Sequence, residues 1–453
     1  MHFYGKGLNT YIYMLKEFED LFAHREMAMP NFSAKEIESM PNIFQLVDYI
    51  KGKEDNLLDE DDGWRHFSSA FPGIPLMMAY NSIDSKERIY VNDTDPDKFI
   101  VNRLGSGRYN LKPNMNTHRF IFRGQKKHYP TIRSSADRGG KYRFLLSNVQ
   151  AEDFMLLLRT HPLFMMFDHG IYLSGMKKPL FLEMNYYGLA QHYNFNTGLV
   201  DFTTDISAAA FFAVTRNLGA DKYEPYGGTA DNPVGVIYVH KVDPNMTFNF
   251  CAYCSIGQQI YPRTAAQHGL FYQEGVSRVP VEKTVMPFFF RHDMECSKRI
   301  FEMMGCGKRL FPDDDLSVVA NEILQSKEVS GEAMARNNYI NQDNLEENIR
   351  ILKENGITVN WHKRRCFTPD MLNSYYRDVK NKLWPTFCKN IDFLDDKNGE
   401  QLMQALEDLP NNPYYKQYFD RRYFGLLQYH AMNDSERAKR NAALIKACRP
   451  EQS

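Results

Sequence analysis

The sequence predicts an α+β protein whose C-terminal region is mostly helical. Short runs of apolar, β-branched and aromatic residues, typical of strands, occur at 118–124, 198–204 and 234–242. Helix signals lie between these runs, at 150–160 and 205–215. The last part of the chain shows mainly helix patterns.

Composition excludes two broad classes of protein. The 453 residues include 55 Lys and Arg against 56 Asp and Glu, a net charge of -1. A surface devoted to nucleic acid needs many unpaired cations, so this balance argues against one. With 43% hydrophobic and 14% aromatic residues, the chain has ample apolar area for cores, which excludes global disorder.

Nothing in the sequence indicates a membrane segment or a secretory signal. The longest apolar runs, such as Ala208 to Val214, are far below the ~18 residues that span a bilayer. Lys16, Glu17 and Glu19 lie where a signal peptide needs its apolar core. Seven cysteines are too sparse for a disulfide framework, so we expect a cytoplasmic protein.

Three regions are expected along the chain. Residues 1–112 mix helix and strand signals, and their acidic stretch at 54–62 is predicted to be a solvated loop. Residues 113–326 alternate strand-like and helix-like segments. Residues 327–453 are mostly helical.

Local sequence justifies each element of the central region. The run at 118–124 ends at a glycine, as expected of a strand that leads into a loop. Asp205 is a suitable N-cap for a helix rich in Ala and Phe. The run at 234–242 lacks polar alternation, which predicts a strand buried on both faces.

Helix signals in the C-terminal region are of three kinds. Thr368-Pro369-Asp370 offers an N-cap hydroxyl followed by proline in the first turn. The segment from Glu346 to Asn355 ends before Gly356, a plausible C-cap. An amphipathic pattern runs from Asp434 to Cys448.

Three apparent motifs do not indicate a phosphate loop, a metal site or a nucleic-acid contact. Gly305-Cys306-Gly307-Lys308 lacks the spacing of a phosphate loop and is followed by Arg309 instead of Ser or Thr. Cys251 and Cys254 have zinc-ligand spacing but no second tight pair, so no metal is predicted. The basic run 362–365 is best interpreted as a solvated face.

The candidate site begins at the end of the first central strand. Arg123 ends an apolar run and is followed by Gly124 and Gln125. This arrangement presents a guanidinium at a sheet edge, where it can bind phosphate or carboxylate in a bidentate manner. The alternative is an arginine paired with an internal acid.

Two more segments supply polar groups. Thr203 and Thr204 stand between a strand and a helix start, which suits anion or ribose binding. Helix capping by Thr204 or Asp205 is the alternative. Gln267 follows a polar turn and either faces a cleft or is a simple turn residue.

Together these segments resemble the FRG domain family, named after its Phe/Tyr-Arg-Gly motif. The resemblance covers less than half of the chain. The family commonly has Arg after the Thr of the third element, but Gly198 stands here, so a second acid or phosphate contact from that position is missing. The matching segments are FRGQ at 122–125, QHY at 191–193, Thr-x-Leu-x-Asp-x-Thr at 197–203, AFFA at 210–213, AQHGLF at 266–271 and LFPDDD at 310–315.

The order of these elements is also similar to that of the ADP-ribosyltransferase superfamily, whose split, mostly antiparallel sheet binds NAD in a central cleft. The similarity implies that Arg123 holds the NAD pyrophosphate and that Thr203 or Thr204 positions the arginine and the nicotinamide ribose. It also implies that Tyr193 or Phe202 stacks on nicotinamide. The implied NAD-contacting residues are Arg123, Gly124, Gln125, Tyr193 and Thr204.

Cleavage of the nicotinamide–ribose bond also needs a carboxylate near the ribose, because positive charge develops there. The transferases usually supply Glu, whereas Gln267 can donate and accept hydrogen bonds but carries no charge. Either Glu274 reaches the cleft, or Glu183 or Asp201 replaces it, or the site binds without turnover. His192 is a candidate general base or a buried structural histidine.

The sequence therefore predicts an NAD-using ADP-ribosyltransferase or NAD glycohydrolase with an unnamed macromolecular acceptor. The family resemblance implies a toxin-like or anti-phage effector of a microbe. One alternative is a nucleotide- or nucleic-acid-sensing module, with Arg123 and residues 126–128 as its anion patch and Tyr129 stacking on bases. Another is a scaffold whose C-terminal helices bind a partner. An acid in the same cleft as Arg123 would favour the enzyme.

Overall fold

The computed structural model describes twelve stretches of more than two residues and some single positions. None of the helices in this described part is long and apolar enough to cross a membrane. The described residues are 31–60, 99–103, 109–113, 118–161, 164, 170, 181, 184–219, 221–241, 253–255, 261–273, 280–312, 314–341, 344–363, 365–368, 371 and 439.

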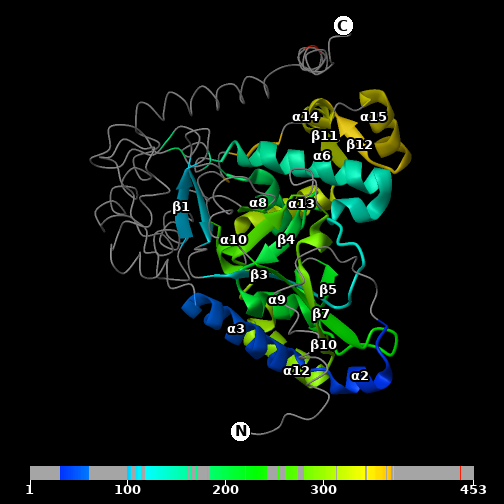
Figure 1. The fold of residues 1–453 in the computed structure, drawn as a ribbon. Helices are drawn as coiled ribbons and strands as arrows, with labels where there is room; N and C mark the ends of the chain where they lie inside the picture. The colour runs from blue at the N-terminus through cyan, green and yellow to red at the C-terminus, as the bar shows by residue number, and fades with distance from the viewer. Residues whose placement is uncertain are drawn as a thin grey trace, which may run out of the picture.

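A six-stranded sheet forms the centre of the molecule (Figure 1). Its strand order is β10-β7-β3-β4-β9-β8, and all neighbouring strands are antiparallel. Together with the surrounding helices, this confirms the predicted α+β class. The strands are β3 (Phe120–Gln125), β4 (Val200–Thr203), β7 (Val234–Lys241), β8 (Tyr253–Ser255), β9 (Gly269–Tyr272) and β10 (Met286–Arg291).

Helices and three smaller sheets surround this sheet. The α-helices are α2 (Ala34–Ser39), α3 (Ile43–Glu60), α6 (Gly140–Leu158), α8 (Tyr186–His192), α9 (Ile206–Ala213), α10 (Pro262–Ala266), α12 (Met294–Met303), α13 (Asp315–Gln325), α14 (Gly331–Asn341) and α15 (Leu345–Glu354). Short 3-10 turns are η2 (Ala136–Gly139), η4 (Val281–Lys283) and η5 (Gly305–Gly307). The small sheets pair β1 (Phe99–Arg103) with β2 (Tyr109–Pro113), β5 (Thr215–Gly219) with β6 (Lys222–Pro225), and β11 (Glu328–Ser330) with β12 (Thr358–Asn360).

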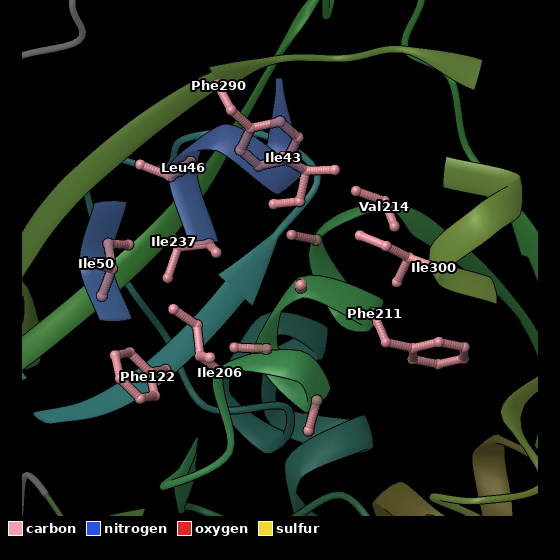
Figure 2. Packing of buried hydrophobic residues seen from close by; sticks show 14 of the residues in the cluster. Ile43, Leu46, Ile50, Phe122, Ile206, Phe211, Val214, Ile237, Phe290 and Ile300 are labelled. Atoms are coloured by element: carbon pink, nitrogen blue, oxygen red, sulfur yellow. The ribbon is translucent and has the colours of Figure 1, made fainter. Parts of the chain in front are cut away.

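One face of the large sheet is covered by α3, α9 and α12. Figure 2 shows apolar side chains of these helices meeting alternate residues of β3, β7 and β10. The alternation follows from the two-residue repeat of a strand. Members of this core are Ile43, Leu46, Ile50, Phe122, Ile206, Phe211, Ile237, Phe290 and Ile300.

The opposite face of the sheet packs against Val281 of η4 and against residues between the elements, such as Ile132 and Val285. A third cluster joins α6 to α14 and α15 through Val149, Met334 and Leu352. In Figure 1 this helical layer lies at the other end of the molecule from α3 and α12.

Most of the elements predicted for the central region are confirmed. The strands at 118–124, 198–204 and 234–242 correspond to β3, β4 and β7. The predicted helix at 205–215 is α9, and β7 is buried at its centre, as its unbroken apolar run predicts. The helix predicted at 150–160 begins earlier, at Gly140.

The acidic stretch predicted as a loop is helical as far as it is described. Helix α3 continues to Glu60 because its apolar face, Ile43, Leu46 and Ile50, packs on the sheet core. Glu54 accepts the backbone N–H groups of Arg119 and Phe120 at 2.7 and 3.0 Å. This acid therefore satisfies backbone donors at the start of β3 rather than solvating a loop.

The C-terminal prediction is confirmed where it can be followed. Helix α15 matches the predicted helix before Gly356, which adopts a positive φ of 76°. The predicted helix from Asp434 to Cys448 lies outside the described residues, apart from position 439. The helix start predicted at Thr368 cannot be followed either, because the next two residues also lie outside the described residues.

Gly124 is the point at which α9 touches the sheet most closely. A Cβ built there overlaps the Ala209 carbonyl oxygen and lies 2.9 Å from the Ala213 nitrogen. The small side chains of α9 let its backbone approach β3, and Gly124 leaves the space that this approach requires. The glycine after Arg123 therefore has a packing role.

We predict that Gly124→Ala destabilises the fold, because the added methyl group must displace helix backbone rather than a movable side chain. The expected loss in free energy of unfolding is about 3 kcal/mol, measured by chemical denaturation. Gly52→Ala is the matched control: a Cβ there meets nothing within 4 Å. In a helix this control should be neutral or slightly stabilising. Equal stability of the Gly124→Ala protein and the wild type would contradict the packing role.

Candidate functional site

A cleft opens where β3 and β4 part. The two described strands are paired at one position, Phe122 opposite Thr203, whereas β3 pairs with β7 along its whole length. Beyond this point a cleft of about 550 Å³ is lined by residues of β3, α8, β4, α9, the β5–β6 hairpin and β9. Its volume lies in the range of small-molecule sites.

Arg123 bridges the gap between the parted strands. Its Nη1 donates to the backbone carbonyl of Asp201 at 2.9 Å and lies 3.7 Å from the Asp201 carboxylate. The Arg123 side chain is 12% exposed, and that exposure is to the cleft. Because β3 is an interior strand, Arg123 lies where β3 and β4 part and not at the predicted sheet edge. It is partnered by an acid, as the alternative expected.

The Asp201 carboxylate lies in the same cleft and is 57% exposed there. Its Oδ1 accepts a hydrogen bond from the Gln191 amide of α8. The Gln191 Oε1 in turn accepts from the Thr197 hydroxyl. The carboxylate is therefore held by neighbouring groups while it remains open to a ligand.

The cleft changes the acidity of both members of this pair. Restricted hydration between its walls raises the pKa of Asp201, and the Arg123 guanidinium opposes that rise. The same restriction lowers the pKa of Arg123, which Asp201 opposes. Each charge depends on the other, so an anionic ligand near Arg123 would compete with Asp201 for it.

Gln125 completes the surroundings of the guanidinium. Since residues alternate along a strand, Gln125 and Arg123 project from the same face of β3. With its amide oxygen turned toward Arg123, Gln125 accepts from Nε and Nη2 at 3.2 and 3.1 Å. Gly124, between them, faces α9.

Of the two hydroxyl groups predicted to position the ribose, that of Thr203 makes hydrogen bonds within the protein and that of Thr204 is buried. Thr203 Oγ1 donates to the Gln267 carbonyl at 2.7 Å and accepts from the Asp205 N–H at 3.0 Å. Thr204 is buried and does not line the cleft. Asp205 caps α9 by accepting a hydrogen bond from the Ser207 N–H, which is the helix-capping alternative expected from the sequence.

Gln267 and His192 lie together on one wall of the cleft. The Gln267 amide donates to the Leu310 carbonyl at 2.9 Å. His192 is 7% exposed and packs edge-on against Phe271. Burial, reinforced by the nearby Arg263 charge, lowers the pKa of His192 to about 3, so the imidazole is neutral at physiological pH.

The two aromatic candidates lie in different places. Tyr193 is 1% exposed, packs on Phe154 and donates its hydroxyl proton to Asp314 at 2.6 Å, away from the cleft wall. Phe202 lines the cleft. A wall that sequence reasoning missed contains Tyr223 and Phe311, whose rings stack with centroids 5.0 Å apart.

Sequence reasoning also missed a buried arginine behind the cleft. Arg263 of α10 is 2% exposed and binds Asp221 at 2.7 Å, with Asp314 at 3.9 Å. Its guanidinium lies over the Tyr193 ring, 5.0 Å from the centroid. These partners come from distant segments, so no local spacing signalled the network.

Several predicted groups cannot be placed. Glu274, Glu183 and Cys251 lie outside the described residues. Within the described part of the chain, no group of three His, Cys, Asp or Glu side chains is arranged to hold a metal ion. The segment around Gly305 forms the short turn η5.

Comparison with known proteins gives one match. Residues 118–222 match the family model of the FRG domain. The matched range includes Arg123, His192, Asp201 and Thr203, while Gln267 reaches the cleft from beyond it. Searches of curated proteins and of solved structures found no match.

The buried histidines predict loss of stability in mild acid. Burial lowers the pKa of His161 and of His192 to about 3, against about 6.5 in an unfolded chain. As pH falls below 6.5, the unfolded state gains protons that the folded state cannot accept, so the free energy of unfolding decreases. Each such histidine should cost roughly 2 kcal/mol between pH 7 and pH 5.

Chemical denaturation at pH 7 and pH 5, with wild type and His192→Gln, measures this effect. The variant removes one of the two groups, so its stability should depend less steeply on pH. An unchanged pH dependence in His192→Gln would show that His192 takes up protons equally in the folded and the unfolded protein, which contradicts the lowered pKa.

Proposed function

The chain contains an FRG domain at residues 118–222, and from this premise we propose that it is an NAD-using enzyme of the ADP-ribosyltransferase or NAD glycohydrolase type. One observation carries the proposal: the Asp201 carboxylate and the Arg123 guanidinium share one cleft. The parting of β3 and β4 at this cleft supports the similarity to a split transferase sheet.

Asp201 has the properties that the bond-breaking step needs. When the bond between ribose C1′ and the nicotinamide nitrogen breaks, the electron pair leaves with nicotinamide and positive charge builds on the ribose. A fixed carboxylate stabilises this charge without having to reorganise. The Gln191 amide, braced by Thr197, holds the Asp201 carboxylate in place.

Arg123 and the aromatic wall would bind the two ends of the substrate. A guanidinium recognises phosphate oxygens in a bidentate manner, and Arg123 is positioned by Asp201 and Gln125. The stacked Tyr223 and Phe311 rings offer an apolar surface for a flat base. Burial is the main cause that raises the pKa of the Tyr223 phenol, and the nearby Asp221 and Asp201 carboxylates add to the rise.

In the second half of the reaction, an acceptor oxygen bonds to C1′ and loses a proton. Water gives a glycohydrolase, and a nucleophile on another molecule gives a transferase. His192 is neutral but a weak base, since burial lowers its pKa to about 3. We assign the proton to Asp201, whose raised pKa makes it the stronger base of the two.

The geometry favours this function over a nucleic-acid-sensing module. Tyr129, the ring expected to stack on bases in such a module, and the nearby Tyr226 already have cations over them. Lys127 Nζ lies over Tyr129, 5.1 Å from the ring centroid, and Lys126 Nζ lies over Tyr226 at 5.3 Å. A base would have to displace these cation–π contacts, which weakens the sensing alternative.

We predict that the purified protein releases nicotinamide from NAD and that Asp201→Asn reduces the rate at least about a hundredfold, because it removes the charge that stabilises the ribose cation. Arg123→Ala should raise the KM for NAD and lower kcat/KM. Chromatographic detection of nicotinamide, with candidate protein, RNA and DNA acceptors present, measures both effects.

Asp231→Asn is the matched control, since Asp231 is an exposed acid outside the cleft. It should release nicotinamide at the wild-type rate. Absence of release by a folded wild-type protein in every acceptor mixture would refute the proposed activity. Wild-type rates in Asp201→Asn would remove Asp201 from the mechanism.

The pKa shift of Asp201 also predicts how activity changes with pH. The bond-breaking step needs the ionised carboxylate, so kcat/KM should fall as pH decreases. Because the cleft raises the pKa of Asp201, the midpoint of this fall should lie above the ordinary pKa of an aspartate. A rate profile that is flat from pH 4 to pH 7 would contradict the assignment.

A further inference from the structure

A second guanidinium, that of Arg138, lines the cleft beside Arg123. Arg138 lies in the short turn η2, between β3 and α6. Its Nε and Nη2 both donate to the Arg133 carbonyl, at 3.1 and 2.8 Å. This anchor fixes one edge of the guanidinium and leaves Nη1 without an intramolecular partner among the described residues.

Hydrogen bonds join the turn that carries Arg138 to Thr197, which braces the Asp201 carboxylate through Gln191. The Ala136 N–H donates to the Thr197 carbonyl at 3.2 Å, and the Thr197 N–H donates to the Ser135 hydroxyl at 3.2 Å. The Thr197 hydroxyl then donates to Gln191, which binds Asp201. Arg138 therefore has a fixed place relative to the carboxylate, although its side chain is exposed.

Charge is not balanced at this part of the cleft. Arg138 is near enough to lower the pKa of Arg123 by like-charge repulsion and to lower that of Asp201 by attraction. Two guanidinium groups thus face one carboxylate, and Lys126 adds a further cation to the cleft lining. An anion with more than one negative charge would relieve this repulsion.

We propose that Arg138 and Arg123 together form a diphosphate subsite, in which each guanidinium binds one phosphate group of a dinucleotide. Arg138 is then a binding residue that selects nucleoside diphosphate derivatives over nucleosides. The inference rests on the proposed function, because it names the part of NAD that the two arginines recognise. A diphosphate carries two negative charges, one for each of the two guanidinium groups. Arginine also binds phosphate in a bidentate manner, which lysine cannot do.

Calorimetric titration with ADP-ribose and with adenosine tests the subsite without requiring catalysis. Arg138→Gln should raise the Kd of ADP-ribose about tenfold or more and leave that of adenosine unchanged. Arg138→Lys should recover part of the affinity, because it restores charge without the planar fork. ADP-ribose affinity of the wild type should also fall with added salt more steeply than that of Arg138→Gln.

Arg350→Gln is the matched control. It removes another exposed guanidinium, from α15, where Arg350 pairs with Glu354 away from the cleft. Its ADP-ribose affinity should equal that of the wild type. Since Arg138 is exposed, Arg138→Gln should unfold at the wild-type temperature, which a thermal scan confirms.

The outcomes separate the subsite from the activity. Unchanged ADP-ribose affinity in Arg138→Gln, or wild-type protein that binds ADP-ribose no more tightly than adenosine, would overturn the subsite. Nicotinamide release together with either result would leave the proposed function standing. Arg138-dependent ADP-ribose binding without nicotinamide release would support the subsite and refute the enzyme.

Discussion

The hydrogen bond from Arg123 to the Asp201 carbonyl is the contact on which the cleft depends. Where β3 and β4 part, this carbonyl has no ladder partner on β3, because the two described strands pair only through Phe122 and Thr203. Arg123 supplies the donor from its side chain. The same guanidinium therefore bridges the parted strands and presents its charge to the cleft, so the structural contact and the proposed ligand contact fall on one residue.

Much of the fold follows from the sequence because its signals are local. The unbroken apolar run of β7, the Asp205 cap of α9 and the glycine after α15 each have a physical cause within a few residues. The loop that the sequence predicts at the acidic end of α3 is wrong, because the helical state there depends on packing against the sheet and on Glu54 binding Arg119 and Phe120. Tertiary contacts override local propensity there.

The candidate site was predictable in part. The Arg123 motif marked the cleft, and Asp201 was among the acids considered, but no spacing indicates that Gln191 and Thr197 brace it. The aromatic pair Tyr223 and Phe311 comes from segments far apart in the chain. Long-range contacts of this kind leave no periodic signal, because each partner is set by the fold and not by its neighbours.

The most direct test of this account is a crystal structure of the Asp201→Asn protein with NAD, because the variant should bind NAD without consuming it. The account predicts the diphosphate at Arg123 and the ribose C1′ facing the side chain of residue 201. NAD bound elsewhere, or a cleft that holds NAD with its ribose turned away from residue 201, would contradict the assignment of the carboxylate.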